Sequence, residues 1–233
     1  MSVLETKNIS KQYPGTLALN HINVSFDSGR VHAFVGKNGS GKSTLLKVFS
    51  GAISPTSGEF FLDGKEIMIR RPEDAIRAGI VLAPEDRKKD GLCTKLSIRH
   101  NIALPNLDLL CSRMGVVSRT KEDEMCNKVV ADLKVKTPNV DVNAGNLSGG
   151  NQQKVVVGKW LARNSRVVIF DEPTRGIDVA AKVEIYNLMN QLKQQGIAVM
   201  FVSSEMPEVM GIADRIIVMC DGRITGELMA ESR

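Results

Sequence analysis

A glycine-rich run that contains a lysine and a hydroxyl residue is the clearest candidate for chemistry in this sequence. It fits the pattern GxxxxGK[ST] and follows an apolar run, 31–35, that predicts a buried strand. Its members are Gly36, Lys37, Asn38, Gly39, Ser40, Gly41, Lys42 and Ser43, with Thr44 next in the chain. Glycines let backbone N–H groups converge on an anion, and the helix predicted over 43–49 adds the positive end of its dipole. The run therefore predicts a phosphate cradle in which Lys42 reaches the β- and γ-phosphates and Ser43 coordinates Mg²⁺.

Two adjacent carboxylates end a second apolar run. Residues 167–170 predict a buried strand, and Asp171 and Glu172 follow it directly. An α/β sheet binds its ligand at the carboxyl ends of parallel strands, and consecutive strand side chains point in opposite directions. We therefore expect Asp171 to hold Mg²⁺, directly or through water, and Glu172 to polarise the attacking water as general base. The alternative is two solvated acids at a strand end.

A serine followed by two glycines opens a helix predicted over 148–162. Ser148 is placed to cap that helix, and the N–H groups near Gly149 and Gly150 are placed to bind phosphate. Together with the cradle and the acid pair, in this order along the chain, the triplet resembles the signature sequence of ATP-binding-cassette (ABC) transporter ATPases. The resemblance spans nearly the whole chain. It implies ATP as the nucleotide and two cassettes that sandwich two nucleotides head to tail.

The resemblance assigns roles to further positions. Tyr13 resembles the aromatic residue that stacks on adenine, with a tyrosine of the core as the alternative. Asp178 resembles part of the loop that acts across the dimer, and the segment 86–146 resembles the helical lobe that docks on membrane subunits. The implied partners are a second cassette, in a homodimer or heterodimer, membrane permease subunits and, indirectly, a sugar-binding protein. Nucleic acid is not among them.

A narrower resemblance concerns the ATPases of bacterial monosaccharide importers of the ribose, galactose and xylose type. It is carried by the segments 85–92, 147–154, 171–178 and 202–209. Those ATPases usually carry two cassettes, whereas this chain has one cradle and one signature, and from about Gly79 onward it is similar to the second cassette. A natural single cassette, a cut domain and a fusion of halves all remain open.

Two positions depart from the general ABC pattern. Glu85 aligns with the glutamine that usually contacts Mg²⁺ and the attacking water, and Ser204 aligns with the histidine that usually contacts the γ-phosphate. A carboxylate at position 85 can still bind Mg²⁺ but adds negative charge near that phosphate, and Ser204 cannot carry positive charge. We therefore expect ATP binding with slow hydrolysis when this cassette acts alone, and a better site on the facing cassette. The three histidines, His21, His32 and His100, lie elsewhere in the sequence.

The elements that must position these residues follow an α/β rhythm. Short β-type runs fill the stretch to about Glu66, with Asp63 and Gly64 as a hairpin turn, and a more polar segment contains a helix predicted over 119–133. A helix over 180–195 and strands over 198–202 and 216–219 follow the acid pair. The expected fold is a P-loop NTPase core with a mostly parallel sheet, an N-terminal antiparallel β-subdomain and an inserted helical lobe. We expect one nucleotide-binding domain over 1–233, with the ATPase core at 1–85 and 147–233 and the helical subdomain at 86–146.

Bulk properties fit this interpretation without selecting it. The 233 residues are 42% hydrophobic and 24% charged, and the net charge of +5 is scattered, with 87–89 as its densest run in a predicted solvated loop. The four cysteines form no CxxC pair and predict reduced thiols in a cytosolic protein. No apolar run approaches the ~20 residues of a membrane-spanning helix. The resemblance implies a peripheral place on the inner face of the cell membrane, through the permease.

Three functions compete at this point. The leading hypothesis is an ATPase that energises monosaccharide import. The alternative is a catalytically weak cassette that dimerises on ATP and acts as the regulatory half of an asymmetric pair. A soluble ABC ATPase of DNA repair or translation is disfavoured, because such proteins usually carry long coiled-coil or linker insertions. The imported sugar cannot be named from this chain, and uptake of an autoinducer or nucleoside stays open.

Overall fold

The computed structural model describes residues 2–230 of the chain, which fold into two compact units. The first unit comprises 1–82, 165–173 and 189–233, and the second comprises 83–164 and 174–188. Within the described residues, no helix combines the length and the apolar character that crossing a membrane would require.

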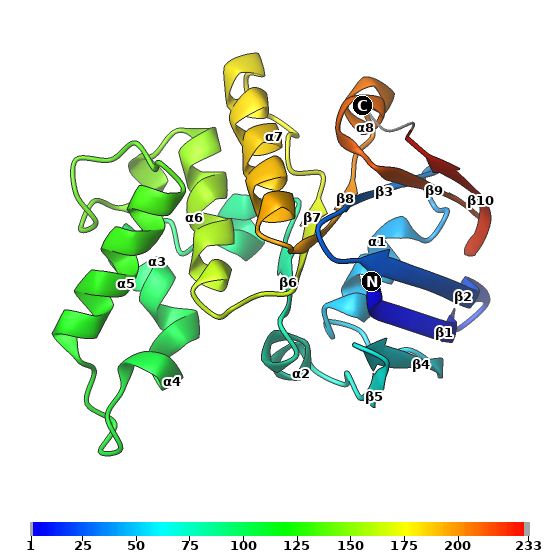
Figure 1. Ribbon diagram of the computed structural model, residues 1–233, viewed down its shortest axis with the longest axis horizontal. Helices are drawn as coiled ribbons and strands as arrows, with labels where there is room; N and C mark the ends of the chain where they lie inside the picture. The colour runs from blue at the N-terminus through cyan, green and yellow to red at the C-terminus, as the bar shows by residue number, and fades with distance from the viewer. Residues whose placement is uncertain (1, 231–233) are drawn as a thin grey trace. The chain divides into compact units, whose positions relative to one another are not determined.

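An antiparallel sheet of four strands, in the order β2-β1-β4-β5, opens the first unit (Figure 1). Its strands are β1 (Ser2–Tyr13), β2 (Thr16–Asp27), β4 (Ser57–Leu62) and β5 (Lys65–Ile67). All three pairings are antiparallel. The turn between β4 and β5 has positive φ at both Asp63 (49°) and Gly64 (74°), the conformation that a two-residue hairpin favours. The predicted antiparallel N-terminal sheet and its Asp63–Gly64 turn are confirmed.

A six-stranded sheet carries the functional segments, in the order β10-β9-β3-β8-β7-β6. The strands are β3 (Val31–Val35), β6 (Ile80–Ala83), β7 (Val167–Asp171), β8 (Ala198–Val202), β9 (Arg215–Cys220) and β10 (Arg223–Met229). Strand β3 pairs in parallel with both β8 and β9, and β7 pairs in parallel with β8. Strand β10 is antiparallel to β9. Every residue of β3, β7 and β8 is buried, as expected for apolar runs in a sheet covered on both faces. The mostly parallel sheet is therefore confirmed.

The core of the first unit joins its two sheets through aromatic side chains. Phe26 of β2 contacts Phe34 of β3, with ring centroids 5.9 Å apart, and Phe49 of helix α1 (Lys42–Phe49), at 5.5 Å. Phe49 in turn contacts Phe60 of β4 at 6.1 Å. Because these rings hold both β3 and α1, they also fix the two ends of the loop between them. The unit also contains α2 (Pro72–Arg77) and α8 (Met206–Ile212).

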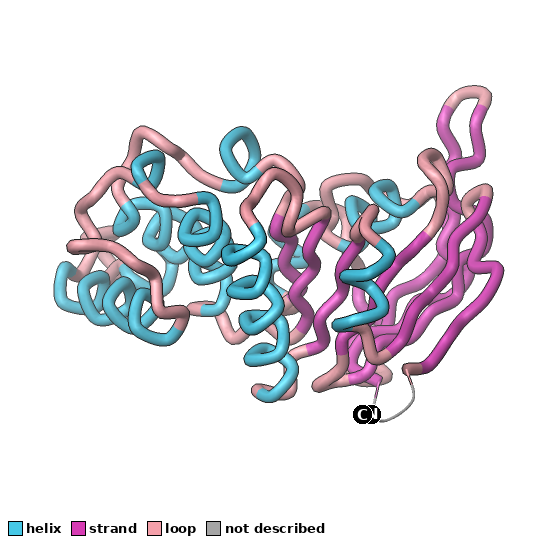
Figure 2. Tube along the Cα trace, turned by 90° about the horizontal axis from the view of Figure 1, so that it is seen from above, coloured by secondary structure: helices cyan, strands magenta, loops and turns pink. Residues whose placement is uncertain are grey.

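The second unit is mainly helical. Its elements are η1 (Arg87–Gly91), α3 (Ile98–Ala103), η2 (Leu104–Asn106), α4 (Leu107–Leu110), α5 (Arg119–Asp132), η3 (Ala144–Asn146), α6 (Gly149–Leu161) and the part of α7 (Val179–Gln194) that precedes residue 189. Arg99 of α3 is buried and forms ion pairs with Asp123 of α5 and with Asp141, the latter at 2.7 Å. Helices α5 and α6 meet at Gly158, where a Cβ atom would lie 2.4 Å from Val129 Cγ1. Figure 2 colours these helices cyan and the strands of the two sheets magenta.

The predicted helices and strands agree with these bounds to within one or two residues. The division of the chain into a core at 1–85 and 147–233 and a helical subdomain at 86–146 stays a prediction. The second compact unit contains 86–146 together with α6 and the first part of α7.

Candidate functional site

The glycine-rich run lies between β3 and α1, as its pattern requires. Strand β3 ends at Val35 and the helix begins at Lys42, with Gly41 as its N-cap residue at φ 101°. A side chain at Gly41 would lie 2.7 Å from the Ala18 carbonyl oxygen, so only glycine fits this position without moving the backbone. The first N–H groups of α1 have no partner within the helix. The cradle (residues 36–43) therefore presents amide donors at the positive end of a short helix.

Lys42 folds back over the cradle loop. Its Nζ atom donates to the carbonyl oxygens of Gly36 (2.6 Å) and Lys37 (3.0 Å), with the Ser40 hydroxyl at 3.4 Å. Burial lowers the pKa of the Lys42 ammonium, while the nearby charges of Glu172 and Asp171 raise it. The Lys42 ammonium is thus held near both predicted acids. It now donates to backbone carbonyl oxygens, and phosphate oxygens can take their place as acceptors.

Asp171 is the last residue of β7 and is 8% exposed. Burial raises the pKa of this carboxyl, the Glu172 charge raises it further, and Lys47 and Lys42 oppose them. A divalent cation beside the buried carboxyl would offset the cost of its charge. Ser43, in the first turn of α1 and exposed, supplies the second oxygen. These two side chains offer the oxygen ligands that Mg²⁺ takes, so the residues fit the ion, and the assignment stays a prediction.

Glu172 adopts a left-handed backbone conformation, with φ 46°, which is uncommon for a residue other than glycine. Its N–H donates to the Val202 carbonyl (3.0 Å), and its carboxylate accepts from the Ser204 N–H (3.1 Å) and hydroxyl (3.2 Å). We expected the two acids to be separated by the alternation of a strand. The strand instead ends at Asp171, and the backbone bends at Glu172. Asp171, Glu172, Ser204 and Lys42 are thus brought together within the first unit.

Tyr13 ends β1 and is 36% exposed, with Lys11 Nζ 5.3 Å from the centre of its ring. The interpretation of Tyr13 as a core residue is therefore wrong. The adenine role of Tyr13 stays a prediction.

The signature residues start α6 in the second unit. Ser148 is the N-cap, and its hydroxyl accepts from the N–H (3.5 Å) and the side-chain Nδ2 (2.8 Å) of Asn151. The predicted cap is therefore confirmed. Gly149 is closely enclosed, because a Cβ atom there would lie 2.9 Å from Arg87 Nη2 and 3.0 Å from Ile177 Cγ2. Three segments far apart in the sequence thus meet at the start of α6.

Glu85 also lies in the second unit, where it forms a short ion pair with Arg175. Asp178 directly precedes α7, and its carboxylate accepts from the Ala181 N–H at 2.9 Å. Sequence reasoning gave no role to Arg87 or to Arg175, although both lie inside quoted motifs. The only signal for either arginine was that it lies inside a segment, 85–92 or 171–178, that also contains predicted site residues.

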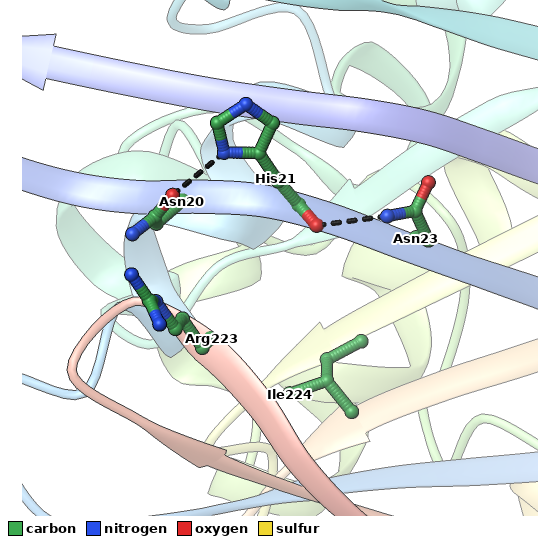
Figure 3. Close-up of a pocket in the computed structure, with 5 residues that line it drawn as sticks. All are labelled: Asn20, His21, Asn23, Arg223 and Ile224. Atoms are coloured by element: carbon green, nitrogen blue, oxygen red, sulfur yellow. Dashed lines mark hydrogen bonds between the residues drawn. The ribbon is translucent and has the colours of Figure 1, made fainter.

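A groove separate from these motifs lies between β2 and β10 of the first unit (Figure 3). It has a volume of about 510 Å³ and is lined by Asn20, His21, Asn23, Arg223 and Ile224. The Asn20 amide lies 2.7 Å from His21 Nδ1, and Asn23 Nδ2 donates to the His21 carbonyl at 2.9 Å. None of the predicted site residues lines this groove.

The β9–β10 turn joins the wall of that groove to the cradle. The Asn20 N–H donates to the Gly222 carbonyl (2.8 Å), and the Gly222 N–H donates to the Ser40 carbonyl (3.1 Å). Strand β2, the turn and the cradle loop are therefore held by two successive backbone hydrogen bonds.

Comparisons with known proteins agree with this geometry. The sequence pattern of the family described as ABC transporter matches residues 19–175. The xylose import ATP-binding protein XylG of Thermoanaerobacter pseudethanolicus is 43% identical over 233 residues, which cover 98% of this chain and 46% of that protein. The ribose import ATP-binding protein RbsA of Bacillus licheniformis is 42% identical over 226 residues, which cover 97% of this chain and 45% of that protein. The chain therefore spans about half the length of the curated relatives it matches.

A solved structure extends the likeness to the fold. The crystal structure of a nucleotide-free ATP-binding cassette from an ABC transporter is 27% identical, with a TM-score of 0.85, and the match covers 99% of this chain and 92% of that one. The chain therefore belongs to the ABC transporter family, and its fold is that of the family's ATP-binding cassette.

Proposed function

We propose that this chain binds and hydrolyses Mg-ATP and thereby energises the import of a monosaccharide by an ABC transporter. The observation that carries the proposal is that Lys42 of the cradle lies near the charges of Asp171 and Glu172, and that Ser204 donates to Glu172. The sugar class is supported by relatives whose names state xylose import and ribose import.

The chemistry follows from the side chains of the first unit. The triphosphate of ATP takes the cradle amides, and Lys42 exchanges the carbonyls of Gly36 and Lys37 for phosphate oxygens. Ser43 and Asp171 would hold Mg²⁺, and the bound ion would neutralise charge on the phosphates. Glu172 accepts a proton from water as the water oxygen attacks the γ-phosphorus. The bond to the β-phosphate oxygen breaks, and that oxygen leaves with the electron pair, giving ADP and phosphate.

The family resemblance also gives roles to residues of the second unit. We assign Glu85 to the cation and attacking water, and Ser148, Gly149 and Gly150 to the γ-phosphate bound by a second cassette. Asp178 is assigned to the loop that acts across the dimer, and Tyr13 of the first unit to the adenine. The proposed partners are that second cassette, permease subunits and, through them, a sugar-binding protein. The chain would act at the inner face of the membrane, held there by the permease.

A second function is favoured by Ser204 and Glu85. A neutral serine replaces a cationic donor, and a carboxylate replaces a neutral amide, so the site lacks two sources of transition-state stabilisation. The chain would then clamp ATP, dimerise and turn over slowly as the regulatory half of an asymmetric pair.

Two measurements on the purified chain separate these functions: single-turnover hydrolysis, and the oligomeric state with and without ATP. Single-turnover hydrolysis of Mg-ATP at saturating protein gives the rate of the chemical step, and a Glu172→Gln variant gives the background without the general base. An ATPase predicts a rate well above that background. A nucleotide-gated clamp predicts ATP-dependent dimers with a rate near the background. A chain that binds no Mg-ATP would contradict both.

A further inference from the structure

The carboxylate of Glu85 does not stand alone in the second unit. It forms a short ion pair with Arg175, which lies 90 residues further along the chain in the loop between β7 and α7. The Arg175 side chain is 68% exposed and that of Glu85 is 42% exposed, so both can be exchanged without emptying a core.

The loop that carries Arg175 is itself tied to the segment that carries Glu85. Arg87 Nη1 donates to the Arg175 carbonyl at 3.5 Å, and Arg87 Nε donates to Gln152 Oε1 at 3.4 Å. Gln152 is 2% exposed, and its amide donates to the carbonyls of Ala144 (3.2 Å) and Gly145 (3.3 Å). Arg87 therefore links the Glu85 segment, the Arg175 loop and the buried side of α6.

The charges of this cluster explain why a carboxylate is tolerated at position 85. In the proposed reaction Glu85 acts at the γ-phosphate end of ATP, where an isolated negative charge would repel the triphosphate. Arg175 supplies one positive charge in direct contact with that carboxylate, and Arg87 supplies a second charge nearby. The pair as a whole is neutral, as a single amide side chain would be.

We propose that Arg175 is a positioning residue that neutralises and orients Glu85, so that the site accepts a γ-phosphate despite the carboxylate. The inference rests on the proposed function and adds a residue to it. Glu85 and Arg175 then form a single two-residue unit, and the loss of Arg175 alone is harmful where the double change is mild.

The test is a cycle of four proteins: the unchanged chain, Glu85→Gln, Arg175→Ala and the double variant. The measurement is the equilibrium affinity of each for fluorescent analogues of ATP and of ADP, with Mg²⁺ and without it. We expect Arg175→Ala to weaken ATP binding by roughly threefold to tenfold, with ADP nearly unaffected because it lacks the γ-phosphate. The double variant should recover the ATP affinity, and Arg175→Lys should keep most of it.

Arg163 and Asp108 provide a matched control in the same unit. They form a two-bond arginine–carboxylate pair, with distances of 2.6 and 2.7 Å, outside every motif. The variants Arg163→Ala and Asp108→Asn should leave the ratio of ATP to ADP affinity unchanged. Steady-state ATPase assays then separate kcat from KM. The Arg175→Ala variant should raise KM for ATP by a larger factor than it lowers kcat.

Two results would overturn the inference. One is an equal loss of ATP and ADP affinity in Arg175→Ala, which marks a general structural role for the loop. The other is a double variant as weak as Arg175→Ala alone. A failure of the proposed function is recognised separately, because the unchanged chain would then lack ATP binding that depends on Lys42.

Discussion

The backbone N–H and the hydroxyl of Ser204 both donate to one oxygen of the Glu172 carboxylate, at 3.1 and 3.2 Å. Ser204 follows β8, Glu172 follows β7, and the two strands are parallel neighbours. The proposed general base is therefore held in place by the residue that stands where the family usually has a histidine. Its orientation does not depend on the charge that the histidine would bring.

Replacing Ser204 with histidine should raise the turnover of ATP. The variant restores a donor able to carry positive charge at the γ-phosphate, and one oriented donor is worth about 10²–10³-fold in rate. We expect a gain of about tenfold or more in kcat. The gain is smaller than the full value of a donor because the change also removes the Ser204 hydroxyl that holds Glu172. Steady-state phosphate release checks this, with Ser204→Ala as the control that removes the hydroxyl and adds no charge. The slow-site interpretation would be contradicted if the unchanged chain already hydrolysed ATP rapidly and Ser204→His did not increase the rate.

Replacing Lys42 with alanine should weaken the binding of Mg-ATP by about 10- to 100-fold. The change removes charge-assisted hydrogen bonds to phosphate, each worth about 1.5–3 kcal/mol. Isothermal titration with a slowly hydrolysed ATP analogue measures the loss. Lys65, exposed on β5, is a suitable control, and Lys65→Ala should bind as the unchanged chain does. Intact affinity in Lys42→Ala would refute the cradle.

Stability should fall as the pH drops from about 6.5 to about 4, and His32 accounts for part of that fall. The imidazole is fully buried against Phe26, and burial lowers its pKa to about 4, while Asp27 and Asp214 oppose that shift. The unfolded chain binds the proton near pH 6.5 and the folded chain does not, so acidification favours unfolding by about 3 kcal/mol over this range. Above pH 6.5 the contribution is complete.

Urea unfolding at pH 7.5 and pH 5 measures the effect as a difference between proteins. A His32→Gln variant should lose less stability between the two values of pH than the unchanged chain. Gln replaces the exposed His21 in the control, which should behave as the unchanged chain. Equal losses for His32→Gln and the unchanged chain would mean that His32 is protonated in the folded state.

Replacing Gly158 with alanine should destabilise the second unit by about 1–3 kcal/mol, although alanine favours helices. The new methyl group would lie 2.4 Å from Val129 Cγ1 and 3.0 Å from Leu133 Cδ1, so α5 and α6 must separate. Trp160 in α6 is the single tryptophan of the sequence, and its fluorescence reports unfolding of this unit. Adding Val129→Ala should recover part of the lost stability. If Gly158→Ala leaves the free energy of unfolding unchanged, α5 and α6 can move apart at little cost.

The sequence predicted those parts of the site that local pattern determines. The apolar runs of β3, β7 and β8 identify buried strands, and the glycine spacing from Gly36 to Ser43 identifies the cradle between a strand and a helix. The cap at Ser148 follows from the same local reasoning. The signals are strong because each depends on neighbours within a few residues.

Other parts depend on contacts between distant segments, and local pattern does not contain them. The pairing of Glu85 with Arg175 joins residues 90 positions apart. The bend at Glu172 is accompanied by a hydrogen bond from its N–H to the Val202 carbonyl on the neighbouring strand. The position of Lys42 depends on which carbonyl groups the folded loop turns inward. Each of these contacts forms only when the fold brings distant segments of the chain together.

The turn at Gly222 has a practical meaning for anyone who wishes to attach a reporter to this chain. Exposed hairpin tips usually tolerate inserted peptides. This one would not, because Gly222 bonds to both Ser40 and Asn20, and lengthening it would pull on the nucleotide loop. The tip near Met114, a residue that is 89% exposed and is followed by Gly115 with open space around it, is the better place for a fluorescent tag.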